Sequence, residues 1–155
     1  MRPTVSAAIA VAAFLATGCA NAGVDTIPHL PQNEGANADV RGVMHVRNAF
    51  LIAGTDPASP APQQSLYAVL INAGTRPDQL DRVTVEGGGS VQLAGPVSLP
   101  PNQPVGTGGR PIGTVTGVRG GAVPMTFDFR QAGSVRVMVP VKYATGQYAT
   151  LTPSP

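Results

Sequence analysis

The chain has 155 residues and a formal net charge of +2, and only 12% of its residues are charged. Its basic residues are scattered and are not interleaved with aromatic residues, which argues against nucleic-acid binding. The chain contains 19 glycines and 16 prolines, which interrupt helices, so the composition favours strands.

Residues 1–18 have the features of a bacterial lipoprotein signal peptide. Arg2 precedes an apolar stretch from Val5 to Ala16, too short to span a bilayer, and small residues lead to Cys19, the only cysteine. We expect signal peptidase II to cut before Cys19 once its sulfur carries a diacylglycerol. Further acylation, for example with palmitate, would then anchor the protein to the extracytoplasmic face of the cell membrane. The alternative is an incidental thiol in an ordinary signal peptide.

The mature chain is expected to contain one domain. Removing 18 residues from 155 leaves 137, enough for a single hydrophobic core. Residues 19–37 are polar and lack periodicity, so they predict a flexible tether. We expect a β-sandwich domain over residues 38–148 and a disordered tail over residues 149–155.

Short segments with strand patterns follow one another along this domain, separated by turn residues. They are Val40–Ile52, Leu66–Ile71, Asp81–Glu86, Ser90–Leu93, Val97–Leu99, Ile112–Val118, Met125–Phe129 and Ser134–Tyr143. This spacing predicts an all-β fold, an immunoglobulin/cupredoxin-like β-sandwich of about seven to nine short strands. No window of helical period stands out.

Alternation within the first and last strands predicts which side chains share a face. In the first strand, one face is expected to carry Met44, Val46, Asn48 and Phe50, and the other Val43, His45, Arg47 and Leu51. The last strand should place Val135, Val137, Val139 and Val141 on one face. Pro140 within it predicts an edge position or a bulge.

The sequence contains no pattern that predicts catalysis. A Ser-His-Asp triad needs a histidine beside a nucleophile, whereas His29 lies in the tether and His45 lies within a strand without a nucleophile elbow. Asp78 and Asp81 lie at a turn, where aspartate caps backbone groups. The expectation is therefore a protein that is not an enzyme.

Copper is the one cofactor for which the chain offers ligands, because thioether and imidazole groups select Cu(I). The candidates are His45, Met44 and His29, together with Met125 and Met138. Met44 and His45 are adjacent, and neighbouring strand residues point to opposite faces, so they cannot easily hold one ion. Met125 shares a face with Phe127 and Phe129, which favours a core position. The residues alone thus predict no cofactor and no metal site.

Two segments carry a resemblance to a known family. They are DRVTVEGGGSVQLAGPVSLPPNQPVGTGG, starting at Asp81, and VPMTFDFRQAGSVRVMVPV over residues 123–141. With the cysteine motif, they resemble the small actinobacterial (mycobacterial LpqE-type) lipoproteins, distant relatives of the periplasmic PCuAC-like copper chaperones. The resemblance implies a cupredoxin-like sandwich and, in the chaperones, Cu(I) held by methionines and histidines.

The resemblance also implies where such ligands would fall in this chain. The His-x-Met element of the chaperones would lie at Ile112 and Thr114, before Gly117–Val118, and the upstream ligands near Glu86 and Leu93. None of these residues is a copper ligand. The resemblance therefore implies the scaffold but carries over no functional residue.

The first functional hypothesis is a lipid-anchored, non-enzymatic binding or accessory lipoprotein of the cell envelope. Its partners would be the membrane, through acylated Cys19, and an envelope protein or small molecule contacted by the loops Gly54–Gln63 and Gly95–Pro111. We expect a monomeric domain. The alternative is a copper-binding or copper-homeostasis protein with an altered PCuAC-like site that uses His45 and His29.

Overall fold

The computed structural model describes residues 34–151, which form an all-β domain, and this confirms the predicted fold class. Its strands are β1 (Ala36–Val40), β2 (Met44–Ile52), β3 (Gln63–Asn72), β4 (Asp78–Val85), β5 (Ser90–Leu93), β6 (Val97–Leu99), β7 (Pro104–Val105), β8 (Gly113–Thr116), β9 (Ala122–Phe129) and β10 (Gly133–Lys142). The helical content of the described residues is one 3-10 turn, η2 (Gly146–Tyr148). No helix within this range is long and apolar enough to cross a bilayer.

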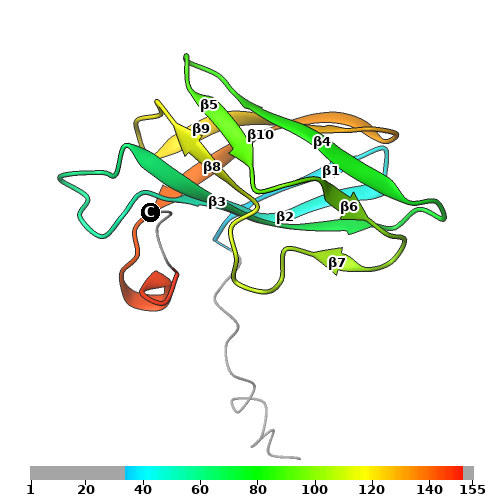
Figure 1. The fold of residues 1–155 in the computed structure, drawn as a ribbon, viewed down its shortest axis with the longest axis horizontal. Helices are drawn as coiled ribbons and strands as arrows, with labels where there is room; N and C mark the ends of the chain where they lie inside the picture. The colour runs from blue at the N-terminus through cyan, green and yellow to red at the C-terminus, as the bar shows by residue number, and fades with distance from the viewer. Residues whose placement is uncertain (1–33, 152–155) are drawn as a thin grey trace, which may run out of the picture. The chain divides into compact units, whose positions relative to one another are not determined.

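The strands form one hydrogen-bonded path that curls into two facing layers (Figure 1). Its order is β5-β8-β3-β2-β10-β9-β4-β6, while β1 pairs with β2 and β7 pairs with β3. The eight strands of this path agree with the expected seven to nine, and β1 and β7 add to them. The sequence missed β1 because its five residues straddle the end of the predicted tether and the start of the predicted first strand, and it missed β7 because that strand has only 2 residues.

The two layers meet where β2 and β10 run parallel. This ladder has two residue pairs, Val141 with Leu51 and Lys142 with Ile52. Pro140 immediately precedes it and pairs only with Ala122 of β9. Proline lacks a backbone donor, so it fits a point where one side of the strand has no ladder partner. β10 is thus not an edge strand as a whole, but Pro140 itself has a ladder partner on one side only.

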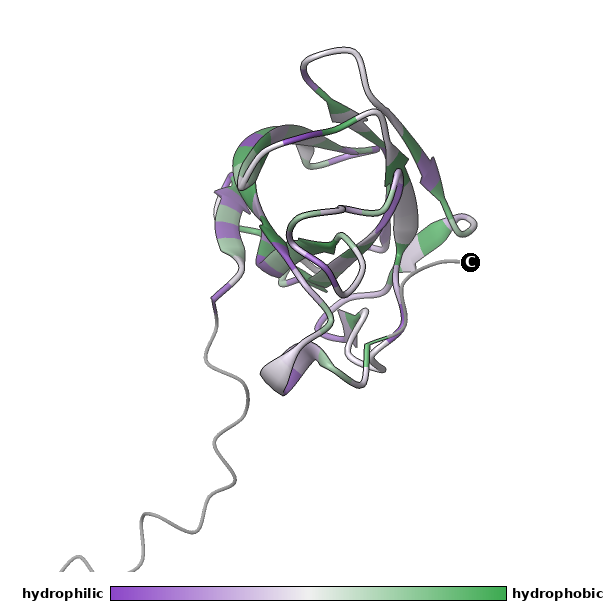
Figure 2. Ribbon diagram, turned by 90° about the vertical axis from the view of Figure 1, so that its left-hand side faces the viewer, coloured by the Kyte–Doolittle hydropathy of each residue, from purple (hydrophilic) through white to green (hydrophobic). Residues whose placement is uncertain are grey.

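The main core lies between the layers, and Figure 2 shows the strands curling around it. β3 contributes Leu66, Ala68 and Leu70 at alternate positions, which is the period of a strand with one face inward. The predicted row Val135, Val137, Val139 and Val141 of β10 also packs against this core. Phe127 and Met125 of β9 are fully buried in it, as their shared face predicted.

A β-bulge at Asn48 changes which side chains of β2 face inward. Two residues, Asn48 and Ala49, lie opposite one residue of β3, and Asn48 has a φ of 49°, which asparagine tolerates better than most residues. Its backbone N–H donates to the Asn37 side chain, and its own Oδ1 accepts from Gly35. Before the bulge Met44 and Val46 face the core, as predicted; after it Leu51 does so.

Phe50 was therefore assigned to the wrong face by strict alternation. It lies on the outer face of the sheet and forms a second cluster with Ile52, Tyr67, Ala144 and Tyr148. The ring of Phe50 stacks on Tyr67 at a centroid distance of 5.2 Å. The 3-10 turn η2 contributes Tyr148 to this cluster, and Leu151 packs against it, so the chain stays packed beyond the expected domain end at residue 148.

Within the described residues, packed structure extends past both predicted ends of the domain. β1 begins at Ala36, within the segment expected to be tether, and Leu151 packs on the second cluster within the expected tail. Glu34 accepts hydrogen bonds from Lys142 Nζ and Tyr148 Oη, both at 3.2 Å. The start of the described segment is thus tied to its end.

Candidate functional site

His45, the main candidate ligand, lies in a surface ion-pair cluster on β1 and β2. It pairs in register with Asp39, and its Nδ1 lies 2.6 Å from Asp39 Oδ1. Arg47 Nη2 lies at the same distance from that oxygen. The hydrogen bond from His45, followed by that from Arg47, lowers the pKa of the Asp39 carboxyl below its ordinary value. This carboxylate orients the imidazole and leaves Nε2 as the ring nitrogen that Asp39 does not engage.

The methionines do not join His45. Met44 is 1% exposed and belongs to the main core, so it points away from the His45 cluster, as strand alternation predicted. Met125 is also buried in the core, whereas Met138 is half exposed on the outer face of β10. Within residues 34–151, no group of three or more His, Cys, Asp or Glu side chains is placed to hold a metal. Cys19 and His29 lie outside the described residues.

The positions that the family resemblance implied for copper ligands have other roles. Glu86 forms an ion pair with Arg136, whose Nη2 lies 3.0 Å from Glu86 Oε2. Leu93 and Ile112 pack against the main core. With Thr114 at the remaining place, this set supplies no thioether or imidazole, so it does not fit a Cu(I) site.

The two ends of the sandwich differ in how their buried polar groups are satisfied. At one end, which we call the closed end, Asn72 is 3% exposed and Asp78 is 8% exposed. Asn72 Nδ2 donates to the backbone oxygens of Arg76 and Leu99, and its Oδ1 accepts from Gly74. The Asp78 carboxylate accepts from three backbone N–H groups, those of Gln79, Gln131 and Ala132. Both side chains are therefore hydrogen-bonded within the fold, and the hollow that they line at this end is smaller, at about 240 Å³.

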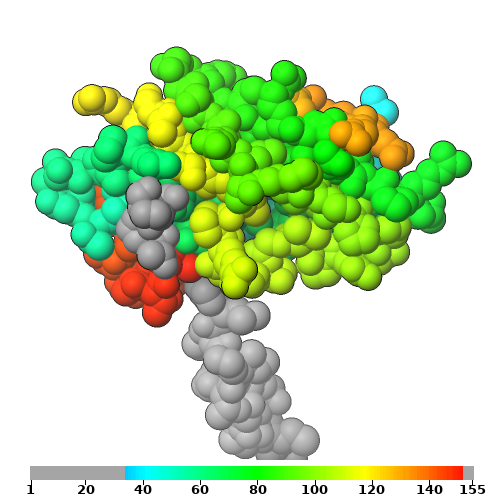
Figure 3. Space-filling view, viewed as in Figure 1, coloured from blue at the N-terminus to red at the C-terminus, as the bar shows by residue number. Residues whose placement is uncertain are grey.

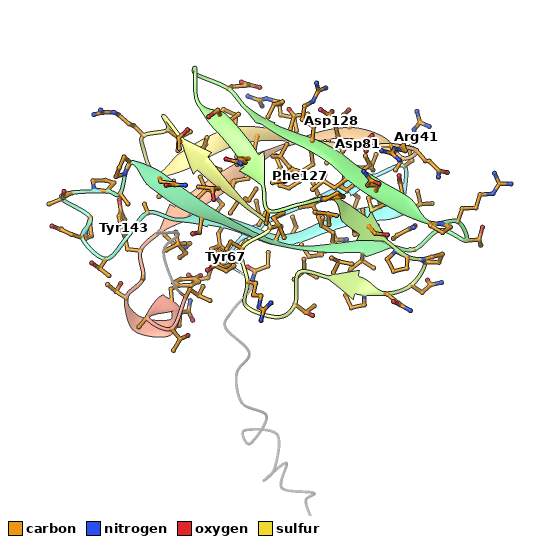
Figure 4. The ribbon with its side chains drawn as sticks, in the orientation of Figure 1. Arg41, Tyr67, Asp81, Phe127, Asp128 and Tyr143 are labelled. Atoms are coloured by element: carbon orange, nitrogen blue, oxygen red, sulfur yellow. The ribbon has the colours of Figure 1, made fainter. Side chains whose placement is uncertain are left out.

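The opposite end contains a cavity of about 510 Å³, which we call the open-end cavity. It is lined by Pro57, Pro60, Ala61, Pro62, Gln64, Gly117, Val118, Arg119, Gly120, Val141 and Tyr143. The loop that follows β2 and the loop that follows β8 both protrude at this end, at the left of Figure 3. Figure 4 shows Tyr143 at the same end, where the chain leaves β10.

Gln64 is the buried polar residue of the open-end cavity. It is 2% exposed, and its side-chain Oε1 has no hydrogen-bond partner within the described part of the chain. It shares the inward register of β3 with Leu66, Ala68 and Leu70, so the strand places it on the core side of the sheet. A buried acceptor without a donor is unusual in native proteins. The cavity beside it makes this end a candidate binding site.

Sequence reasoning found one wall of this cavity and missed its buried polar group. The loop Gly54–Gln63, expected to make contacts, contributes three prolines to the lining, whereas no residue of Gly95–Pro111 lines it. Gln64 was missed because the predicted strand began at Leu66. The signal was present, since Gln64 lies two residues before the first inward-facing apolar residue.

Comparison with known proteins identifies the fold class. No family model and no curated protein match the chain. Among solved structures, the apo PCuAC domain from PmoF1 is similar over 69% of this chain and 98% of its own, with 28% identity and a TM-score of 0.56. The copper-bound PCuAC domain from PmoF2 covers 69% of this chain and 97% of its own at 20% identity and a TM-score of 0.54. The apo PmoF2 PCuAC domain is similar over 71% of this chain and 97% of its own, with 21% identity and a TM-score of 0.54.

These likenesses show a PCuAC-type β-sandwich. The 28% identity to the PmoF1 domain also supports a distant PCuAC-like relationship. The scaffold that the sequence resemblance implied is thereby confirmed.

Proposed function

We propose that the protein is a lipid-anchored, non-enzymatic binding module of the cell envelope, related to the LpqE-type lipoproteins. Its ligand would enter the open-end cavity. The observation that carries the proposal is the open-end cavity of about 510 Å³, whose lining combines loop prolines with Arg119 and Tyr143. Acylation at Cys19 would hold the domain at the extracytoplasmic face of the membrane.

The chemistry of the cavity favours binding over catalysis. Its buried polar group is an amide, which neither gives up nor takes a proton near neutral pH. The residues that line it include no histidine, carboxylate, lysine or cysteine, the groups that most often act as general acids or bases. The cavity can therefore recognise a molecule by shape and hydrogen bonding.

Two experiments test the two parts of this proposal. Cells expressing the full chain are labelled with radioactive palmitate and fractionated; we expect label in the membrane form and its loss, with release of the protein, in Cys19→Ala. A protein that stays unlabelled and soluble would overturn the anchoring. Native mass spectrometry of the full chain extracted from envelope membranes tests the binding. We expect a non-covalent small-molecule adduct that Gln64→Leu weakens, and repeated preparations without any adduct would contradict it.

A second candidate function is copper handling through an altered site. The PCuAC neighbours favour it, and so does the Asp39–His45 pair, because a carboxylate on one ring nitrogen is the usual support of a metal-binding imidazole. A second ligand would have to come from elsewhere, such as His29. Cu(I) titration of the full chain should then give stoichiometric binding that His45→Ala and His29→Ala each weaken, while Met138→Leu leaves it unchanged. Non-stoichiometric uptake in every variant would remove this candidate.

A further inference from the structure

We infer that the closed end carries a second binding site, in which two arginines hold the phosphate group of a phosphate monoester. The site occupies the hollow of about 240 Å³ that Asn72 and Asp78 line, which we call the closed-end hollow. Figure 4 shows Arg41, which lines this hollow, and Tyr143, which lines the open-end cavity, at opposite ends of the sandwich. The site is therefore independent of the proposed binding function.

Two exposed arginines from different loops line the closed-end hollow. Arg41 lies in the turn between β1 and β2, and Arg76 lies in the loop between β3 and β4. Neither forms an ion pair with any residue in the range 34–151, whereas four other arginines of that range do. Two guanidinium groups at one hollow, both without a carboxylate partner, favour a ligand group that carries more than one negative charge.

The one carboxylate in the lining does not neutralise these arginines. Asp78 is 8% exposed, and its carboxylate accepts hydrogen bonds from three backbone N–H groups at 2.7, 2.9 and 2.9 Å. These donors stabilise its charge within the fold. The exposed side chains of the lining therefore carry only the two positive charges, and the Thr75 hydroxyl adds a neutral donor beside Arg76.

The backbone at Arg41 supplies a separate argument. The Val43 N–H donates to the Val40 carbonyl and closes the turn between β1 and β2. Its central residues, Arg41 and Gly42, both have positive φ, of 50° and 68°. Such turns prefer asparagine, aspartate or glycine, because other side chains are strained at positive φ. An arginine is thus unfavourable for this turn, and residues held in such conformations cluster at functional sites.

The rest of the closed-end hollow defines the size and kind of ligand. Its volume of about 240 Å³ lies below the roughly 300–1,000 Å³ of pockets for drug-sized ligands, so it suits one phosphate group with a small substituent. Val43 lines the hollow and is 39% exposed, which offers that substituent an apolar contact. A phosphate monoester has three free oxygens and about two negative charges at neutral pH, which match two guanidinium groups.

Phenyl phosphate is a suitable probe, because it combines a phosphate monoester with a small apolar group. Methyl phenyl phosphate, a diester with a single negative charge, is the comparison. Binding of both to the full chain is measured by ligand-observed NMR. We expect the monoester to bind more tightly than the diester by about tenfold, the value of one hydrogen bond between charged groups.

Protein variants assign this binding to the two arginines. Arg41→Asn and Arg76→Gln should each weaken the binding of phenyl phosphate by about tenfold. Arg110→Gln is the matched control and should leave binding unchanged. Arg110 is also exposed and has no ion pair within the described chain, but it does not line the closed-end hollow.

Arg41→Asn also separates binding from folding. Asparagine tolerates the positive φ of residue 41, so the midpoint of urea unfolding should stay the same or rise while binding is weakened. A lower midpoint would show that Arg41 supports the turn itself, and would overturn its assignment to a ligand.

Vesicles distinguish two sources of the phosphate group, a soluble ester and a lipid headgroup. The full chain with Cys19→Ala, which removes the expected acylation site, is sedimented with phosphatidylcholine vesicles that contain or lack phosphatidic acid. Binding that requires phosphatidic acid and is weakened by Arg41→Asn and Arg76→Gln identifies a lipid headgroup. Binding of phenyl phosphate without binding to either vesicle identifies a soluble ester.

Three results would overturn the proposed site. The first is a parent chain that binds neither phenyl phosphate nor the vesicles with phosphatidic acid. The second is equal binding of monoester and diester, and the third is a loss of binding in Arg110→Gln as large as in Arg41→Asn and Arg76→Gln. None of these results bears on the open-end cavity, because none of the three arginines lines it.

Discussion

The closed and open ends of the sandwich can be compared along one row of side chains on β3. The inward-facing row starts with Gln64, continues through Leu66, Ala68 and Leu70, and ends with Asn72. Both terminal residues carry an amide, and both are almost completely buried, at 2% and 3% exposure. All hydrogen-bonding groups of the Asn72 amide named above have backbone partners, whereas the Oε1 of Gln64 has none within the described chain.

The difference shows that a buried amide can have one of two roles, depending on whether its hydrogen-bonding groups have partners. A satisfied one is part of the framework, because its partners fix the turns around it. An unsatisfied one costs stability, so its presence calls for a reason other than folding. Replacing these residues should therefore have effects of opposite sign at the two ends, and the following predictions run from the largest effect to the smallest.

Asp78→Ala should be the most damaging change at the closed end. It removes the acceptor of three backbone N–H groups and leaves that of Ala132 buried. We expect the free energy of unfolding to fall by about 3 kcal/mol. Urea denaturation measures this, with Asp81→Ala as control; that exposed carboxylate pairs with Arg130, and its loss should cost about 0.5 kcal/mol or less. Equal effects of the two variants would show that the hydrogen bonds of Asp78 contribute no more to stability than an exposed ion pair does.

Asn72→Leu should destabilise the protein by about 2 kcal/mol, because the buried Leu99 carbonyl loses its donor. Urea denaturation is again the measurement. Gln92→Leu is the matched control, since Gln92 is an exposed amide on β5 and its replacement should change stability by about 0.5 kcal/mol or less. If Asn72→Leu left the free energy of unfolding unchanged, the proposed difference between the amides of Asn72 and Gln64 would be wrong.

Gln64→Leu should stabilise the protein by about 1 kcal/mol, because it removes a buried acceptor that has no partner and keeps a side chain of similar size. The midpoint of urea unfolding should rise at unchanged slope. A marked loss of stability would indicate that the Gln64 amide supports the fold, and would weaken its assignment to a ligand.

Acid should weaken the ion pair that lies next to the open end. The hydrogen bond from Arg136, and then its charge, lowers the pKa of Glu86 below the ordinary 4.5. A depressed pKa contributes stability above the ordinary value and loses it as the pH falls through the folded value. Stability measured on either side of pH 4.5 should thus decline less steeply in Glu86→Gln than in the parent. Identical slopes would show that this exposed pair contributes nothing.

Much of the fold could be predicted because its strands are short, alternating and bounded by turn residues. β5 and β6 have the predicted bounds, and the valines of β10 face the core as expected. The face of Phe50 could not be predicted, because the bulge at Asn48 depends on hydrogen bonds with Asn37 and Gly35, which lie on another strand and before it. Short-range alternation contains no information on such distant partners.

The candidate site was less accessible to sequence reasoning. Gln64 has a detectable register, but its lack of a partner depends on which loops surround it in three dimensions. The same applies to Arg119, which is one of several scattered arginines until the structure shows which of them form ion pairs. His45 was identified as a candidate from its residue type, but its orientation by Asp39 required the register of β1 against β2.

The extra residue in β2 also matters for anyone who aligns this chain with other sandwiches. Asn48 and Ala49 lie opposite a single residue of β3. Even-numbered residues of β2 therefore face the core before the bulge, and odd-numbered residues face it after the bulge. An ungapped alignment that continues through this segment with an unbulged homologous strand would match interior positions of one protein with exterior positions of the other. Inheritance of ligand or core assignments beyond residue 48 therefore requires a one-residue gap at the bulge.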